Sequence, residues 1–140
     1  MNNLVVFAER YHGNVHLNVI CPGIVMARYI GLFRVAVSVN NLQQMLNDVL
    51  ASCNFDVIYE TGDYLMAREI PGRVAFNQLV VVEVLIDKTT ATDREVRMKF
   101  VIKNEELPLQ VDNHCRQVFN QVSEAISTSH HWKLIEAVAG

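Results

Sequence analysis

The residue types with the greatest capacity for chemistry gather at Asn113, His114, Cys115 and Arg116. A cysteine near the start of a helix can be stabilised as a thiolate by the helix dipole, and a histidine beside it can assist as a base. Consecutive helical residues, however, point about 100° apart, so His114 and Cys115 cannot act on the same substrate atom. Cys115 also shares an apolar helical spacing with Val118. We therefore expect a buried Cys115 and a rim or surface His114.

Two carboxylates, Glu105 and Glu106, precede the same helix. Paired carboxylates support acid–base catalysis when they are buried in unequal environments. Adjacent glutamates before a helix more often complement its positively charged end, and we prefer that interpretation here. A small enzyme that uses His114, Cys115 and this pair is therefore the third of three functional hypotheses, and we assign no catalytic residue.

Glu83 interrupts the apolar run of residues 79–86 (LVVVEVLI). Inside a cavity, a carboxylate among valines would have a raised pKa and could hold the polar group of a ligand. Alternatively, Glu83 faces outward and is partly exposed, as one face of an antiparallel sheet commonly is, and we prefer this second interpretation. If the protein does bind a small apolar ligand, the candidate polar contacts are Glu83, Tyr64 and His114.

Positive charge recurs along one predicted strand, at Arg94, Arg97, Lys99 and Lys103. This stripe could contact phosphate groups or an acidic protein partner, or it could be a solvated strand face that discourages edge pairing. Phe100 is predicted to face inward, so no aromatic residue shares the outward face with Arg97, Lys99 and Lys103, which lowers the prospect of single-stranded nucleic acid. The net charge of −3 and the pI near 5.9 also disfavour nucleic acid as the partner.

The segment His130-His131-Trp132 is a second candidate partner contact, with Trp132 as its anchor. Two adjacent histidines without further ligands make a poor metal site. The sequence also lacks a Walker loop and the motifs GxGxxG, GxSxG and HExxH. We therefore expect neither a metal nor a cofactor.

The composition indicates one folded domain in a reducing compartment. With 140 residues, of which 51% are hydrophobic and 19% charged, the chain can bury a core without disulfide staples. Cys21, Cys53 and Cys115 are odd in number and far apart, which disfavours a disulfide framework. No apolar run reaches the roughly 18–20 residues of a membrane span, and the first residues do not resemble a secretory signal. We expect a single cytoplasmic domain over residues 1–140 without a transmembrane segment.

Hydrophobic periodicity predicts the elements that hold these residues. Period-two alternation and β-branched runs predict strands, and apolar residues at helical spacing predict helices. The predicted strands are 33–39, 55–60, 64–69, 76–86 and 94–102, and the predicted helices are 40–53 and 109–126.

Several boundary residues are also predicted. Asn40 is the expected N-cap of the first helix, and Asn54 is its expected stop. We expect Gly62 to adopt a positive φ in a tight turn. Residues 1–30 are either a hairpin or a loosely attached extension, and residues 128–140 form a tail with room for a short helical turn.

The predicted fold class is α+β, a two-layer structure in which a curved antiparallel sheet packs against a long C-terminal helix. Its core order is β–α–β–β–β–β–α. Over residues 32–127 this order resembles the TBP-like and helix-grip folds, in which a curved sheet wraps a terminal helix. The resemblance implies a cavity between the sheet and that helix, although a fold alone does not fix a function.

A second resemblance concerns residues 103–110 (KNEELPLQ) and 113–116 (NHCR). These segments are similar to those of small cyanobacterial proteins without an assigned activity. The resemblance therefore implies no particular reaction or ligand.

Three functional hypotheses remain in order. The first is a non-catalytic binding or scaffold protein that acts through a protein-partner surface, self-association included, because apolar residues fall on both faces of the run 79–86. The alternative is a carrier of a small apolar ligand between the sheet and the terminal helix. The enzyme described above is the third.

Overall fold

A computed structural model describes residues 26–106 and 113–139 of the protein. In chain order, its elements are β1 (Ala27–Ala36), α2 (Val39–Ser52), β2 (Phe55–Glu60), β3 (Tyr64–Glu69), the 3-10 helix η1 (Phe76–Gln78), β4 (Val81–Asp87), β5 (Val96–Asn104), α3 (His114–Thr128) and β6 (Lys133–Ala139).

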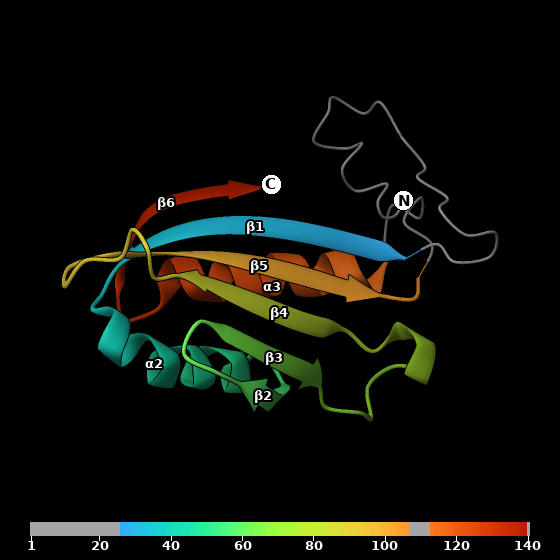
Figure 1. Ribbon diagram of the computed structural model, residues 1–140. Helices are drawn as coiled ribbons and strands as arrows, with labels where there is room; N and C mark the ends of the chain where they lie inside the picture. Colours follow the sequence, from blue (N-terminus) through green and yellow to red (C-terminus); the bar gives the residue numbers. More distant parts are fainter. Residues whose placement is uncertain (1–25, 107–112, 140) are drawn as a thin grey trace.

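The six strands form one antiparallel sheet in the order β2-β3-β4-β5-β1-β6. Helix α3 packs against β1, β5 and β6, and α2 packs against β2 and α3, so both helices lie on the same side of the sheet (Figure 1). We call the helix-covered side the inner face and the opposite side the open face. This architecture confirms the predicted α+β class and the predicted core order, to which β6 adds a further strand.

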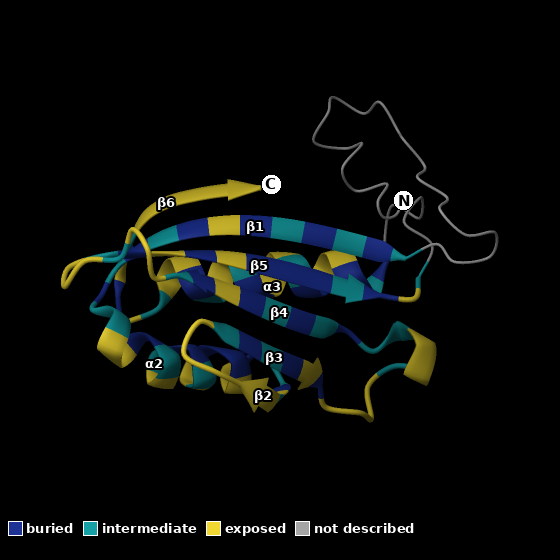
Figure 2. Ribbon diagram, in the orientation of Figure 1, coloured by how far each residue is buried: buried dark blue, intermediate teal, exposed yellow. Residues whose placement is uncertain are grey.

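The core lies between the inner face and the helices. Alternate residues of β4 and β5 point inward, as predicted, and meet the buried stripe of α3. Figure 2 shows this buried band in the central strands, with exposed residues on β2 and β6 at the two edges. The buried residues of β4, β5 and α3 include Val82, Val84, Ile86, Val96, Met98, Phe100, Ile102, Cys115, Val118, Val122 and Ile126.

Strand β1 starts at Ala27, several residues before the predicted start at 33. The inward alternation continues back through Gly31 and Tyr29. Glycine fits at position 31, where a Cβ would lie 2.7 Å from the ring of Phe33. Residues 27–30 are therefore part of the sheet and not of a separate extension. The hairpin or extension predicted for the preceding residues lies in 1–25, outside the described residues.

Helix α2 has a different N-cap from the predicted Asn40. The Ser38 hydroxyl accepts a hydrogen bond from the backbone amide of Asn40 at 3.3 Å, so the N-cap lies two residues earlier than predicted. Its buried face consists of the predicted Leu42, Leu46, Val49 and Leu50. At its end Asn54 adopts a φ of 72°, which agrees with its prediction as a stop.

The β2–β3 hairpin has the predicted bounds, but its turn is built differently. Among the described residues, positive φ values occur at Asn54 and at Gly72, which has a φ of 127°, and not at Gly62. The glycine that needs conformational freedom is therefore Gly72, in the connection between β3 and η1.

The predicted strand 76–86 is shorter than expected. Residues Phe76–Gln78 form a 3-10 turn, and the strand begins at Val81. The backbone amide of Val80 donates to the buried carboxylate of Glu69, and Phe76 is 83% exposed. Contacts that pattern alone does not reveal thus set the start of β4.

The C-terminal segment also differs from its prediction. Helix α3 starts at His114 with Asn113 as N-cap, and the predicted positions 109–112 lie outside the described residues. In place of a short helical turn after α3, Lys133–Ala139 form β6, which pairs with β1. Trp132 is buried and donates its indole N–H to the carbonyl of Ile126 at 2.9 Å. This contact holds the end of α3 where the chain turns back to the sheet edge.

Among the described residues, no helix is both long and apolar enough to cross a membrane.

Candidate functional site

Two rows of side chains cross four strands of the open face. The strand registers place Leu85 beside Lys99, Lys99 beside Leu32, and Leu32 beside Val138. We call these four residues, from β4, β5, β1 and β6, the first row. The second row lies two residues away along each strand and consists of Asp87, Arg97, Arg34 and Glu136.

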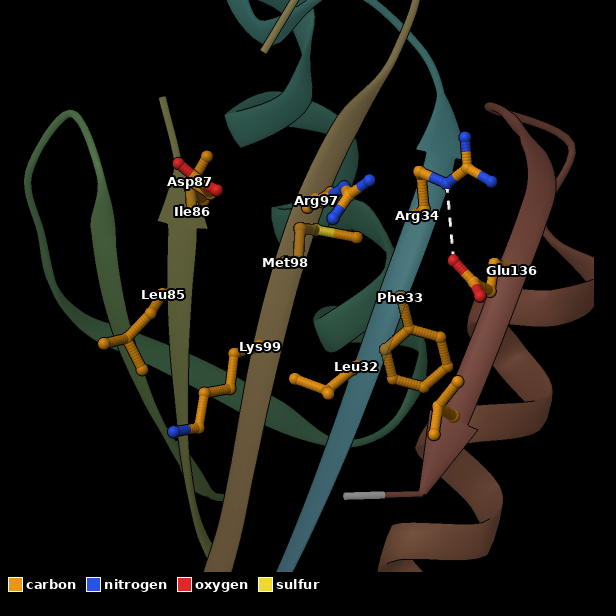
Figure 3. A pocket seen from close by; sticks show the side chains of 11 residues that line it. Leu32, Phe33, Arg34, Leu85, Ile86, Asp87, Arg97, Met98, Lys99 and Glu136 are labelled. Carbon is orange, nitrogen blue, oxygen red and sulfur yellow. Dashed lines mark ion pairs between the residues drawn. The ribbon is translucent and has the colours of Figure 1, made fainter. Parts of the chain in front are cut away.

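The two rows line a hollow of about 440 Å³, which we call the groove (Figure 3). Phe33, Ile86 and Met98 complete its lining. In the first row Leu32, Leu85 and Val138 are 42%, 43% and 49% exposed, so aliphatic surface meets solvent at three neighbouring positions. The groove thus combines apolar surface with charged groups that lie beside it.

Three of the four charged groups in the second row, Arg34, Glu136 and Asp87, already have partners. The guanidinium of Arg34 lies 3.0 Å from Glu95 and 3.5 Å from Glu136. The carboxylate of Asp87 accepts hydrogen bonds from Thr89 and Thr90 in the turn that follows β4. The Thr89 and Thr90 hydroxyls, with the amides of the same residues, lower the pKa of Asp87 to about 2. Asp87 is therefore ionised at neutral pH and committed to its own turn.

A second cluster on the open face contains two of the predicted ligand contacts. The Tyr64 hydroxyl donates to the Glu83 carboxylate at 2.6 Å, and the Lys103 ammonium lies 3.3 Å from the same carboxylate. Burial is the largest influence on the Glu83 pKa and would raise it, but the Tyr64 hydrogen bond and the Lys103 charge outweigh it and lower the pKa. Glu83 is thus an outward-facing, ion-paired carboxylate, which agrees with the interpretation preferred above.

His114 lies on the other side of the sheet from this cluster. Its Nε2 is 2.9 Å from both carboxylate oxygens of Glu69. Glu69 is the last residue of β3, faces inward and is 3% exposed. The histidine side chain is 16% exposed, which is compatible with the predicted rim position. The structure therefore brings Tyr64 and Glu83 together but does not bring His114 to them.

Sequence reasoning missed Glu69, although a signal was present. Glu69 continues the alternation of Leu65 and Ala67, both fully buried, and so falls on the inner face. Its buried carboxylate is satisfied by His114 and by the amide of Val80. These contacts connect β3, the start of β4 and the start of α3, which is a structural role.

The residues assigned to the enzyme hypothesis serve the start of α3. The Glu106 carboxylate accepts hydrogen bonds from the backbone amides of His114 and Cys115 at 3.1 and 2.8 Å, while Glu105 is exposed. Burial is the largest influence on the Glu106 pKa and opposes ionisation, but hydrogen bonds from Asn104 and from these amides outweigh it, so the pKa is lowered. Cys115 is fully buried, as predicted, and burial raises the pKa of its thiol.

The predicted partner surface divides into separate parts. Arg97 and Lys99 lie in the groove, Lys103 is paired with Glu83, and Arg94 is exposed in the connection before β5. Trp132 belongs to the core and offers no surface to a partner. In the described part of the chain, no group of three or more His, Cys, Asp or Glu side chains is placed to hold a metal ion.

No family model matches the chain, and no curated protein matches it either. Among solved structures, the chain is similar to one titled "Crystal structure of conserved protein from Geobacillus kaustophilus". The identity is 13%, the match covers 76% of this chain and 99% of that chain, and the TM-score is 0.36.

Proposed function

We propose that the protein is a non-catalytic binding protein that holds a protein partner on the open face of its sheet. The observation that carries this proposal is the exposed aliphatic surface of the groove, where Leu32 lies beside Val138 and Leu85 lies across Lys99 from them. Exposed apolar surface with polar groups around it is typical of interaction sites. In the part of the chain that the structure describes, α2 and α3 both pack on the inner face, and neither covers the open face.

The start of α3 supports an enzyme less well. A buried Cys115 with a raised thiol pKa is a poor nucleophile, and Glu106 is occupied by the backbone amides of α3. His114 and Glu69 form a close pair, but Glu69 is almost fully buried and also satisfies the amide of Val80. These groups stabilise the fold, which leaves binding as the better-supported activity.

A small-ligand carrier is the second candidate, favoured by one observation. A pocket of about 250 Å³ lies between α3 and the β1–β6 edge, lined among others by Gly31, Phe119, Asn120 and Ala137. This position is where the helix-grip resemblance would place a ligand, but the volume is below the roughly 300–1,000 Å³ of typical ligand pockets. Native mass spectrometry of the purified protein would reveal a bound molecule, and its repeated absence would remove this candidate.

The compartment, the related proteins and the identity of the partner are part of the same proposal. We place the protein in the cytoplasm and among the small cyanobacterial proteins that residues 103–116 resemble. A second copy of the chain is one form that the protein partner could take. Sedimentation analysis over a range of concentrations distinguishes such self-association from a different partner.

The test is site-specific photo-crosslinking in the native host. We expect p-benzoylphenylalanine at position 32 in the groove to capture a discrete protein partner. The matched control carries the same group at Gln121, an exposed position of α3 on the opposite side of the molecule. Equal capture at both positions, or no capture at position 32, would contradict the proposal.

A further inference from the structure

The charges in the centre of the groove are not balanced. Arg34 and Arg97 are direct cross-strand neighbours, and like charges placed opposite each other destabilise a sheet. Arg34 is compensated by Glu95 and Glu136, and Asp87 is held by its own turn. Within residues 26–106 and 113–139, Arg97 has no ion-pair partner. Asp87 is the cross-strand neighbour of Arg97 but forms no ion pair with it, and the lining of the groove as a whole holds three cations, Arg34, Arg97 and Lys99, against two carboxylates, Asp87 and Glu136.

Lys99 is a second cation of this kind. It occupies the first row between Leu32 and Leu85, and in the part of the chain that the structure describes it also has no ion pair. Lys103, two residues further along β5, shows the contrast because Glu83 neutralises it at 3.3 Å. Arg97 and Lys99 point to the same face and are two residues apart, which is about 7 Å along a strand.

The surroundings of these two cations restrict what can neutralise them. Leu32 and Leu85 flank Lys99 on both sides, so a bound carboxylate would lie next to exposed aliphatic surface. Acidic side chains two residues apart in an extended segment are also separated by about 7 Å. The chain as a whole carries a net charge of −3, so attraction for an acidic segment has to arise locally.

We infer that the partner occupies the groove with a short extended segment that is both acidic and aliphatic. Two carboxylates of this segment contact Arg97 and Lys99, and an aliphatic side chain packs against Leu32 and Leu85. This inference rests on the proposed function, because it specifies the chemistry of the segment that the open face would hold.

The experiment measures, by fluorescence anisotropy, binding of a labelled synthetic peptide in which two glutamates and a leucine occupy alternate positions with serine between them, so that all three side chains point to the same face of the extended chain. The double variant R97Q/K99Q should weaken binding about 5-fold or more, because each exposed ion pair contributes little by itself. The matched control R73Q/K88Q removes the same charges at two exposed positions outside the groove and should leave the affinity unchanged. Added salt should weaken binding to the wild-type protein more than binding to R97Q/K99Q.

Two further arms decide the identity of the occupant. A peptide with glutamine in place of glutamate should bind R97Q/K99Q and the wild-type protein equally weakly. Vesicles of anionic phospholipid should not displace the acidic peptide. Equal binding of both peptides to the wild-type protein, equal losses in the two double variants, or displacement by the vesicles would each overturn the inference.

The crosslinking experiment separates this inference from the proposed function. If R97Q/K99Q still captures the partner from position 32 as efficiently as the wild-type protein does, the acidic segment is wrong and the partner surface stands. If position 32 captures nothing in either protein, both proposals fall. If capture is lost in R97Q/K99Q and kept in R73Q/K88Q, both are supported.

Discussion

At the scale of single residues, Tyr64 and Glu83 form a short hydrogen bond on the open face. Their 2.6 Å hydrogen bond, together with burial and the Glu83 charge, raises the pKa of Tyr64 to about 12 from an ordinary value of 10.0. A raised pKa means that this interaction stabilises the fold below about pH 10 and is lost as the pH rises toward 12. The pair therefore reports on the integrity of the open face.

The first prediction concerns this pair. Glu83→Gln should bring the Tyr64 pKa back toward 10, because it removes the carboxylate that favours the protonated phenol. The ultraviolet absorbance of tyrosinate during alkaline titration measures the change. Titration of Tyr64→Phe identifies the contribution of Tyr64 among the four tyrosines of the chain. An unchanged midpoint in Glu83→Gln would show that the hydrogen bond does not control the titration.

The second prediction concerns the cysteines. Cys53 and Cys115 are both buried, and burial raises the pKa of each thiol, so both should resist iodoacetamide in the folded protein and react after unfolding. Peptide mapping by mass spectrometry assigns the label to each cysteine. Fast labelling of Cys115 in the folded protein would instead revive the enzyme hypothesis.

At the scale of elements, the start of α3 depends on a carboxylate that lies before the helix. Glu106 accepts two backbone amides of the first turn and also receives the side-chain amide of Asn104 at the end of β5. This arrangement satisfies amides that a helix start leaves without partners, and it connects α3 to the sheet. The carboxylate pair that suggested catalysis is thus explained by capping at Glu106 and by exposure at Glu105.

The third prediction tests this capping role. Glu106→Ala should lower the free energy of unfolding by about 1 kcal/mol or more, because the capped amides lose a charged acceptor. Since the pKa of Glu106 is lowered in the folded state, the stability gained from its ionisation should be lost as the pH falls below its ordinary value of 4.5. Urea unfolding at neutral and acidic pH measures both effects. Glu105→Ala is the matched control, and an equal loss there would argue against specific capping by Glu106.

At the scale of the whole molecule, β6 completes one side of the groove when it returns to the sheet. Strand β6 supplies Glu136 to the second row and Val138 to the first row, both next to β1. The chain reversal before β6 is anchored by the hydrogen bond from Trp132 to the carbonyl of Ile126 in α3. The same strand forms one edge of the sheet, next to the strand that carries Leu32 and Arg34. Trp132, which the sequence predicted to contact a partner, therefore affects this surface indirectly, through the position of β6.

The fourth prediction tests this dependence. Trp132→Ala should lower the free energy of unfolding by about 3–5 kcal/mol, because it leaves a large cavity and removes the indole hydrogen bond. Trp132→Phe should cost less, since it keeps most of the buried ring. Urea unfolding followed by circular dichroism is the suitable measurement, because Trp132 is the only tryptophan. Stability close to that of the wild-type protein in Trp132→Ala would show that β6 does not depend on this anchor.

Local periodicity was sufficient for the elements whose burial depends on their own sequence. The inward and outward residues of β4 and β5, the bounds of the β2–β3 hairpin and the buried stripe of α2 all follow from alternation or helical spacing. The buried Cys115 follows from helical spacing, and the outward Glu83 follows from strand alternation. The same alternation would have predicted that Glu69 faces inward.

The tertiary structure alone decided which residues meet. Strand order and register set Arg97 against Arg34 and place Lys99 between Leu85 and Leu32, although these residues lie far apart in the sequence. The choice of Ser38 over Asn40 as N-cap and the pairing of β6 with β1 were likewise outside the local pattern. The physical reason is that periodicity records which face of an element is buried, whereas a binding surface depends on which elements become neighbours when that face packs.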